Sequence, residues 1–117
     1  MSLSKPILLY DGDCGFCRRW IERWRKTTGD LVDYAAYQEA GGRFPSISEA
    51  EFRAAVQLVE PDGTIYRAAE AVFRSLAMNR SHRWPLWIYT RVPGAKFLAE
   101  GFYRLIAANR AFFSKFS

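Results

Sequence analysis

The sequence is poor in the residues that build disulfide scaffolds and metal sites: it has two cysteines and one histidine in 117 residues. Two cysteines are too few for a disulfide scaffold, and a chain of this length can bury a core without one. The pair therefore needs another explanation, which is either redox chemistry or metal binding.

Long hydrophobic runs are also missing. No stretch of about 18 uncharged apolar residues, the length that crosses a bilayer, occurs in the chain. The apolar run at residues 7–10 is too short for a signal peptide, so we expect a cytoplasmic protein. Internal repeats and low-complexity tracts are absent as well, which favours one domain over residues 1–117.

Half of the residues are hydrophobic, which excludes a disordered segment, but the net charge of +5 is unevenly spread. Residues 80–117 carry seven Lys or Arg and one Glu, a charge of +6, whereas residues 31–79 carry four basic and seven acidic side chains, a charge of −3. The basic C-terminal third of the chain is either a solvated helix face or a surface for an anionic partner such as lipid or nucleic acid. We expect no nucleic-acid partner.

Both cysteines lie in one short stretch, residues 10–17, Tyr-Asp-Gly-Asp-Cys-Gly-Phe-Cys. The apolar residues before it predict a buried strand at 6–10, and the periodicity after it predicts a helix at 16–26 with Asp13 as N-cap. A strand, a turn, a Cys-x-x-Cys pair and a helix are typical of a thioredoxin-like redox site. The unpaired N–H groups at the start of a helix favour a thiolate at Cys14.

The remaining pattern completes a β-α-β-α-β-β-α core over residues 1–79. We predict strands at 31–35, 54–59 and 64–66, a helix at 48–52 with a Ser48/Glu51 capping box, a helix around 69–77, and a loop at 38–46. This order predicts an α/β, thioredoxin-like fold with a small central mixed sheet, flanking helices and a helical C-terminal extension.

The extension, residues 80–117, is basic and aromatic. From Ala95 to about Phe113 a helical stripe of apolar residues runs through Leu98, Phe102, Leu105, Ile106 and Phe113. The first interpretation of this stripe is packing against the core. The alternative is peripheral membrane contact, because basic helices that carry aromatic residues also lie in the membrane interface.

The motif of residues 10–17 resembles the signature of the DCC family of thiol-disulfide oxidoreductases, whose Asp-x-x-Cys-x-x-Cys pattern is matched by Asp11, Cys14 and Cys17. The later hairpin, the alanine-rich helix and the C-terminal residues 103–110 are similar to that family as well, so the resemblance spans nearly the whole chain. It implies a thioredoxin-like fold and redox activity.

Two features differ from ordinary thioredoxins. The dipeptide between the cysteines is Gly15-Phe16 rather than Gly-Pro, and no proline directly precedes the strand predicted at 54–59, since Pro45 comes too early. Thioredoxins use a cis-proline at that place to hold the substrate backbone. We therefore do not expect a peptide substrate to bind as it does in thioredoxins.

Each residue of the motif receives a predicted role. Cys14, at the start of the helix, is the expected nucleophile, and Cys17, on the face predicted to be buried, is the expected resolving thiol. Asp11 is either a general base that takes or returns the proton of Cys17 or a turn-forming residue at the end of the strand.

The first hypothesis is thus a thiol-disulfide oxidoreductase. It needs no cofactor beyond its dithiol and acts on a disulfide- or thiol-containing protein or small molecule. Two alternatives stay open. One is a non-catalytic module that docks through its basic aromatic C-terminus. The other is a metal-binding protein in which His82 joins Cys14, Cys17 and an aspartate, although a second cysteine pair is missing.

Overall fold

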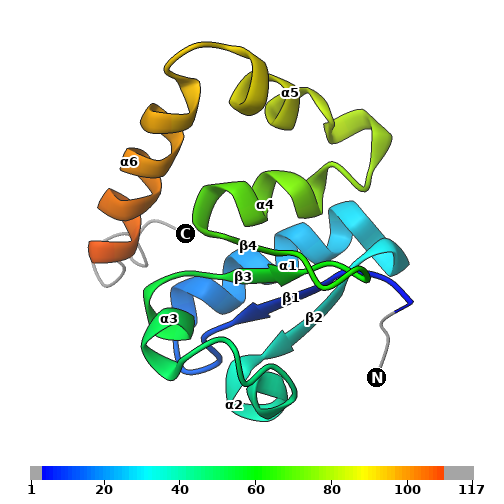
Figure 1. The fold of residues 1–117 in the computed structure, drawn as a ribbon, viewed down its shortest axis with the longest axis vertical. Coiled ribbons are helices and arrows are strands. Elements are labelled where there is room, and N and C mark those ends of the chain that lie inside the picture. Colours follow the sequence, from blue (N-terminus) through cyan, green and yellow to red (C-terminus); the bar gives the residue numbers. More distant parts are fainter. Residues whose placement is uncertain (1–3, 110–117) are drawn as a thin grey trace.

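A computed structural model describes residues 4–109 and contains a four-stranded mixed sheet of order β2-β1-β3-β4 (Figure 1). The strands are β1 (Ile7–Tyr10), β2 (Asp33–Ala36), β3 (Gln57–Val59) and β4 (Ile65–Arg67). β1 pairs with β2 in parallel, whereas β3 is antiparallel to both β1 and β4. The predicted mixed sheet, with one parallel pair and one hairpin, is confirmed.

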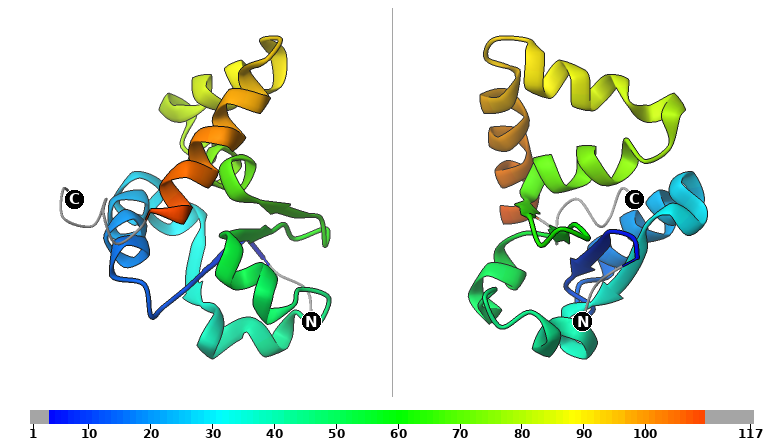
Figure 2. Two further views of the ribbon diagram at one scale, coloured as in Figure 1. Left: turned by 90° about the vertical axis from the view of Figure 1, so that its left-hand side faces the viewer. Right: turned by 45° about the vertical axis from the view of Figure 1, so that its right-hand side comes forward.

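Helices cover both faces of this sheet. The helices are α1 (Gly15–Thr28), α2 (Tyr37–Ala40), α3 (Glu49–Ala54), α4 (Ala68–Leu76), α5 (Trp84–Arg91) and α6 (Ala95–Ala108). Short 3-10 turns follow α1, α2 and α4, at Gly29–Leu31, Gly41–Arg43 and Arg80–His82. Figure 2 shows α5 and α6 beyond α4, on the far side of the sheet from α2.

Alternation along β1 divides the core into two layers. Ile7 and Leu9 face one side, where they pack with Phe52 of α3 and Ala40 of α2. Leu8 faces the other side, in a second cluster that includes α1 and α4. Successive side chains of a strand point to opposite faces, so a short strand that is apolar throughout must be covered on both. This explains why residues 7–10 lack a polar alternation.

The loop predicted at 38–46 is wrong, because α2 and a 3-10 turn occupy much of it. Tertiary contacts hold this segment in place: the ring of Tyr37 stacks on that of Phe52, with centroids 5.0 Å apart, and Ala40 is buried. The two glycines that favoured a loop, Gly41 and Gly42, lie in the 3-10 turn. Packing against the sheet outweighs their poor helix propensity.

The predicted capping box is confirmed. The Ser48 hydroxyl accepts the N–H of Glu51 at 3.1 Å, and the Glu51 carboxylate accepts the N–H of Ser48 at 3.1 Å. These two bonds start α3, which continues to Ala54. The strand predicted at 54–59 is consequently shorter and begins only at Gln57.

The apolar stripe of α6 does not pack as predicted. Leu98, Phe102 and Leu105 are 78%, 63% and 55% exposed, and Phe113 lies outside the described residues. Instead, α6 is anchored by two polar contacts: the Tyr103 hydroxyl accepts the N–H of Val56 at 3.0 Å, and the Glu100 carboxylate accepts the N–H of Ala69 at 2.8 Å. These bonds turn the helix so that part of its apolar stripe faces outward.

α5 is held by one buried aromatic residue. Tyr89 is 5% exposed, and its ring contacts that of Phe73 edge-on, with centroids 5.5 Å apart. Burial, together with the nearby carboxylates of Glu100 and Glu70, raises the pKa of Tyr89 to about 12. The extension thus packs on α4 at Tyr89. Within the described part of the chain, no helix has the length and apolar character needed to span a bilayer.

Candidate active site

Cys14 lies at the start of α1, at the end of the turn that follows β1. It is the N-cap of α1, with φ −96° and ψ 111°, and its Sγ accepts the backbone N–H of Cys17 at 3.2 Å. The prediction that Asp13 caps this helix is therefore wrong: a sulfur takes the place of the usual oxygen acceptor. Cys14 is a free thiol of intermediate exposure, so the first thiol of the pair is reachable and sits in the field of the helix N-terminus.

Asp11 forms the turn before the helix. Its Oδ1 accepts the N–H of Asp13 at 3.0 Å, and its backbone carbonyl accepts the N–H of Cys14 at 3.2 Å. The first bond is an Asx-turn, which confirms the predicted turn-forming role of this aspartate. Its role as a general base stays a prediction.

Gln38 of α2 fastens this turn to the neighbouring part of the chain. Its Nε2 donates to Oδ1 of Asp11 at 2.8 Å and to Oδ2 of Asp13 at 3.3 Å, while its Oε1 accepts the N–H of Gly12 at 3.0 Å. A neutral amide can donate to two carboxylates and also accept from the backbone, without adding charge beside the thiols. The sequence carries no signal for this contact, because Gln38 lies 27 residues from Asp11 in a segment predicted to be loop.

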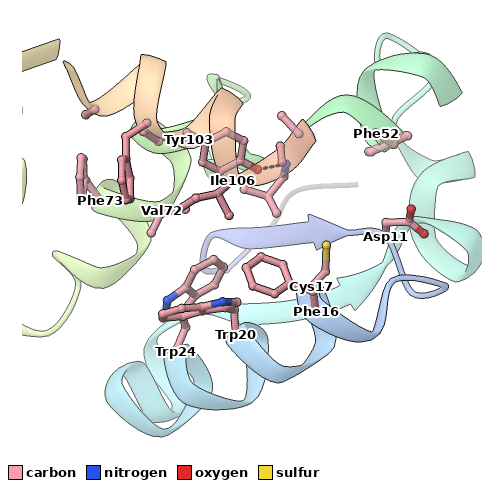
Figure 3. Close-up of a pocket in the computed structure, with 16 residues that line it drawn as sticks. Asp11, Phe16, Cys17, Trp20, Trp24, Phe52, Val72, Phe73, Tyr103 and Ile106 are labelled. Carbon is pink, nitrogen blue, oxygen red and sulfur yellow. Dashed lines mark hydrogen bonds between the residues drawn. The ribbon is translucent and has the colours of Figure 1, made fainter. Parts of the chain in front are cut away.

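Cys17 faces a pocket of about 410 Å³ (Figure 3). The prediction that Cys17 is buried is wrong, since it has intermediate exposure and its sulfur points toward this pocket. Cys17, Trp20, Ile21 and Trp24 fall at helical spacing on one face of α1, which the sequence predicts to be buried. Of these four, only Ile21 is fully buried, whereas Trp20 and Trp24 line the pocket. The two thiols therefore have different surroundings: Cys14 lies at the turn and Cys17 at an apolar hollow.

The pocket is walled by the first helix, the segment before β3, and the helices α4 and α6. Its lining residues are Asp11, Phe16, Cys17, Trp20, Trp24, Phe52, Ala55, Val56, Ala69, Val72, Phe73, Ala99, Phe102, Tyr103, Ile106 and Ala107. Asp11 and Cys17 both line this pocket, but the carboxylate oxygens of Asp11 point away from the Cys17 sulfur (Figure 3).

The alternative of a metal site is not supported. Within residues 4–109, no three His, Cys, Asp or Glu side chains cluster closely enough to hold an ion. His82, the candidate third ligand, lies in the 3-10 turn Arg80–His82 after α4 and is not among the residues that line the pocket beside Cys17.

A family model for DCC1-like thiol-disulfide oxidoreductases matches residues 8–116. This chain belongs to the DCC1-like thiol-disulfide oxidoreductase family. The match begins in β1 and includes both cysteines as well as all of α5 and α6. No curated protein and no solved structure matches the chain.

Membership of the DCC1-like family makes the protein a thiol-disulfide oxidoreductase with Cys14 and Cys17 as its Cys-x-x-Cys pair. It also implies a thioredoxin-like fold, which agrees with the observed parallel β1-α1-β2 unit and antiparallel hairpin. A dithiol of this kind acts on thiol or disulfide substrates.

We predict that Gly12→Ala damages the site while Gly42→Ala does not. A Cβ at residue 12 would lie 2.8 Å from the Cβ of Ala36 and 3.1 Å from Oε1 of Gln38, whereas one at residue 42 would meet no atom within 4 Å. The crowding should lower the free energy of unfolding by about 1–3 kcal/mol and slow disulfide exchange. Urea unfolding and an exchange assay on both variants would check this, and equal behaviour would contradict it.

Proposed function

We propose that Cys14 is the attacking thiol and Cys17 the resolving thiol of the exchange reaction. The observation that carries this assignment is the hydrogen bond from the N–H of Cys17 to Sγ of Cys14 at the start of α1. A donated N–H and the positive end of the helix both stabilise a negative charge on that sulfur. Cys17 lies one turn further along the helix, so its sulfur is not at the positive end of α1.

The reaction transfers two electrons in two exchange steps. The Cys14 thiolate attacks one sulfur of a substrate disulfide, so that a Cys14–substrate bond forms, the substrate S–S bond breaks, and one half leaves as a thiol. Cys17 then loses its proton and attacks Sγ of Cys14, which releases the second half as a thiol and leaves a Cys14–Cys17 disulfide. The reverse sequence oxidises a substrate dithiol.

We also propose that Asp11 is the general base that accepts the proton of Cys17. Both residues border the same pocket, and the Asp11 carboxylate is kept in place by Gln38 and by the N–H of Asp13. Because the oxygens of Asp11 point away from the Cys17 sulfur (Figure 3), the carboxylate accepts this proton through water as Cys17 attacks. The redox group is the dithiol itself, and its substrates are disulfides or thiols.

The roles of the two cysteines can be separated with single variants. Reduced Cys17→Ser treated with bis(2-hydroxyethyl) disulfide should keep a covalent half-molecule on Cys14, because no second thiol can release it. Cys14→Ser should form much less of this adduct in the same time, and the wild type should pass on to its internal disulfide. Intact-mass spectrometry distinguishes the three products. An adduct in Cys14→Ser with none in Cys17→Ser would reverse the roles.

The role of Asp11 is tested by Asp11→Asn. The amide keeps an acceptor for the N–H of Asp13 but cannot take a proton, so the resolving step should slow about ten-fold or more while the first attack is unchanged. Quenched-flow mixing of the reduced protein with excess disulfide, stopped with acid, measures both the first attack and the resolving step. A variant that unfolds more easily but resolves at the wild-type rate would show that Asp11 serves only the turn.

We also propose that α5 and α6 dock on an anionic membrane surface. Trp84, Trp87, Phe97 and Leu98 are between 58% and 80% exposed, which is unusual for large apolar side chains on neighbouring elements. Exposed basic side chains accompany them: Arg80, Arg83, Arg91, Lys96 and Arg104. Exposed aromatic side chains together with lysine and arginine match the interface of an anionic bilayer.

Vesicle flotation tests this second proposal. The protein should float with phosphatidylcholine vesicles that contain phosphatidylserine, and less at high salt, and the variant Phe97→Ser/Leu98→Ser should lose this binding about ten-fold. Ile65→Ser is the control, because Ile65 is an exposed apolar residue that belongs to β4 and not to α5 or α6. Failure of the wild type to float, or self-association through the same residues in sedimentation, would refute the membrane assignment.

A further inference from the structure

The pocket beside Cys17 has the size and the walls of a small-molecule site. Its volume of about 410 Å³ lies within the range of ligand pockets, and its walls come from α1, α4 and α6 as well as the segment before β3. Aromatic side chains dominate the part nearest Cys17, where Phe16, Trp20 and Trp24 project from the same helix, α1 (Figure 3). Such walls favour an apolar occupant.

The ionisable side chains that line the pocket also favour a neutral occupant. Among the described residues that line it, the ionisable side chains are Asp11, Cys17 and Tyr103, and none is a lysine, arginine or histidine. Burying a carboxylate against these apolar walls would cost desolvation free energy, and none of the described lining residues is a cation that would offset it. A neutral molecule avoids this cost, so we expect the pocket to favour neutral disulfides over anionic ones.

At the edge of the pocket, the backbone of Val56 is already hydrogen-bonded and is not available to pair with a polypeptide. The N–H of Val56 donates to the Tyr103 hydroxyl at 3.0 Å, and the carbonyl of Val56 accepts the N–H of Ala68 at 3.0 Å. A peptide that binds as an added strand needs such groups to be available. Because α6 and the start of α4 already satisfy both, strand addition at Val56 would require breaking these contacts.

We infer that this pocket binds the apolar group of a neutral, low-molecular-weight disulfide and presents its sulfur to the cysteine pair. The inference rests on the proposed exchange reaction and names the substrate class for it. Cys14 attacks the bound disulfide, one half leaves as a thiol, and Cys17 attacks Cys14 to release the other half. The substrate gains two electrons and two protons, and the protein gains the Cys14–Cys17 disulfide.

A pair of disulfides of nearly equal size tests this substrate class. Dipropyl disulfide and bis(2-hydroxyethyl) disulfide differ only in having a methyl or a hydroxyl at each end, and each rate is divided by the rate with free 2-mercaptoethanol to remove intrinsic reactivity. Burial favours the methyl and disfavours the hydroxyl, so the reduced wild type should react at least ten-fold faster with dipropyl disulfide on this normalised scale. Glutathione disulfide, which is anionic, should react more slowly than either.

Neighbouring alanines on α6 provide a matched pair of variants. Ala107 lines the pocket, whereas Ala108 is exposed and does not, so Ala107→Phe fills the hollow and Ala108→Phe adds the same ring outside it. The preference for dipropyl disulfide should fall to near unity in Ala107→Phe and persist in Ala108→Phe. If Ala107→Phe unfolds, Ala99→Phe fills the same pocket from two turns earlier on the helix.

The outcomes separate this inference from the reaction on which it rests. If neither disulfide oxidises the wild-type pair, the exchange reaction itself fails. Equal normalised rates, or a preference that survives filling of the pocket, would overturn the inference while leaving the exchange reaction standing.

Discussion

The site depends on how the chain satisfies the first backbone N–H groups of α1, which have no helical acceptor of their own. The sulfur of Cys14 accepts one of them, from Cys17, in a position where most helices use an oxygen. The same contact links the two cysteines and places one thiol at the positive end of the helix. Because the cap is also the reactive group, the chemistry of Cys14 and the start of α1 are parts of one interaction.

The turn before Cys14 must hold two carboxylates close to a thiol, although like charges oppose ionisation. Two arrangements reduce this conflict. Asp11 and Asp13 both accept hydrogen bonds from Gln38, and Asp11 accepts the N–H of Asp13 as well. Parallel pairing of β1 with β2 brings α2, and therefore Gln38, to the same end of the sheet as the turn. The pairing of the two strands thus places Gln38 where it can hydrogen-bond to both aspartates.

α6 serves two surfaces with one helix. Its inner side, anchored by Glu100 and Tyr103, closes the pocket beside Cys17, and its outer side leaves Phe97 and Leu98 in solvent. Phe102 both lines the pocket and is 63% exposed, so the mouth of the pocket and the outer apolar surface meet at this residue. An apolar substrate and a lipid surface would approach the protein from this same region.

The sequence by itself determined the elements whose signals are local: the apolar strand before the motif, the Cys-x-x-Cys helix, the capping box at Ser48 and the hairpin. Periodicity, caps and turn residues act over a few positions, so they can be read without the fold. Only the tertiary structure decided which atoms meet across the chain. Gln38 reaches Asp11 over 27 residues, and Tyr103 reaches Val56 over 47. Those two contacts fix the turn and the orientation of α6, and with that orientation the pocket beside Cys17 is formed.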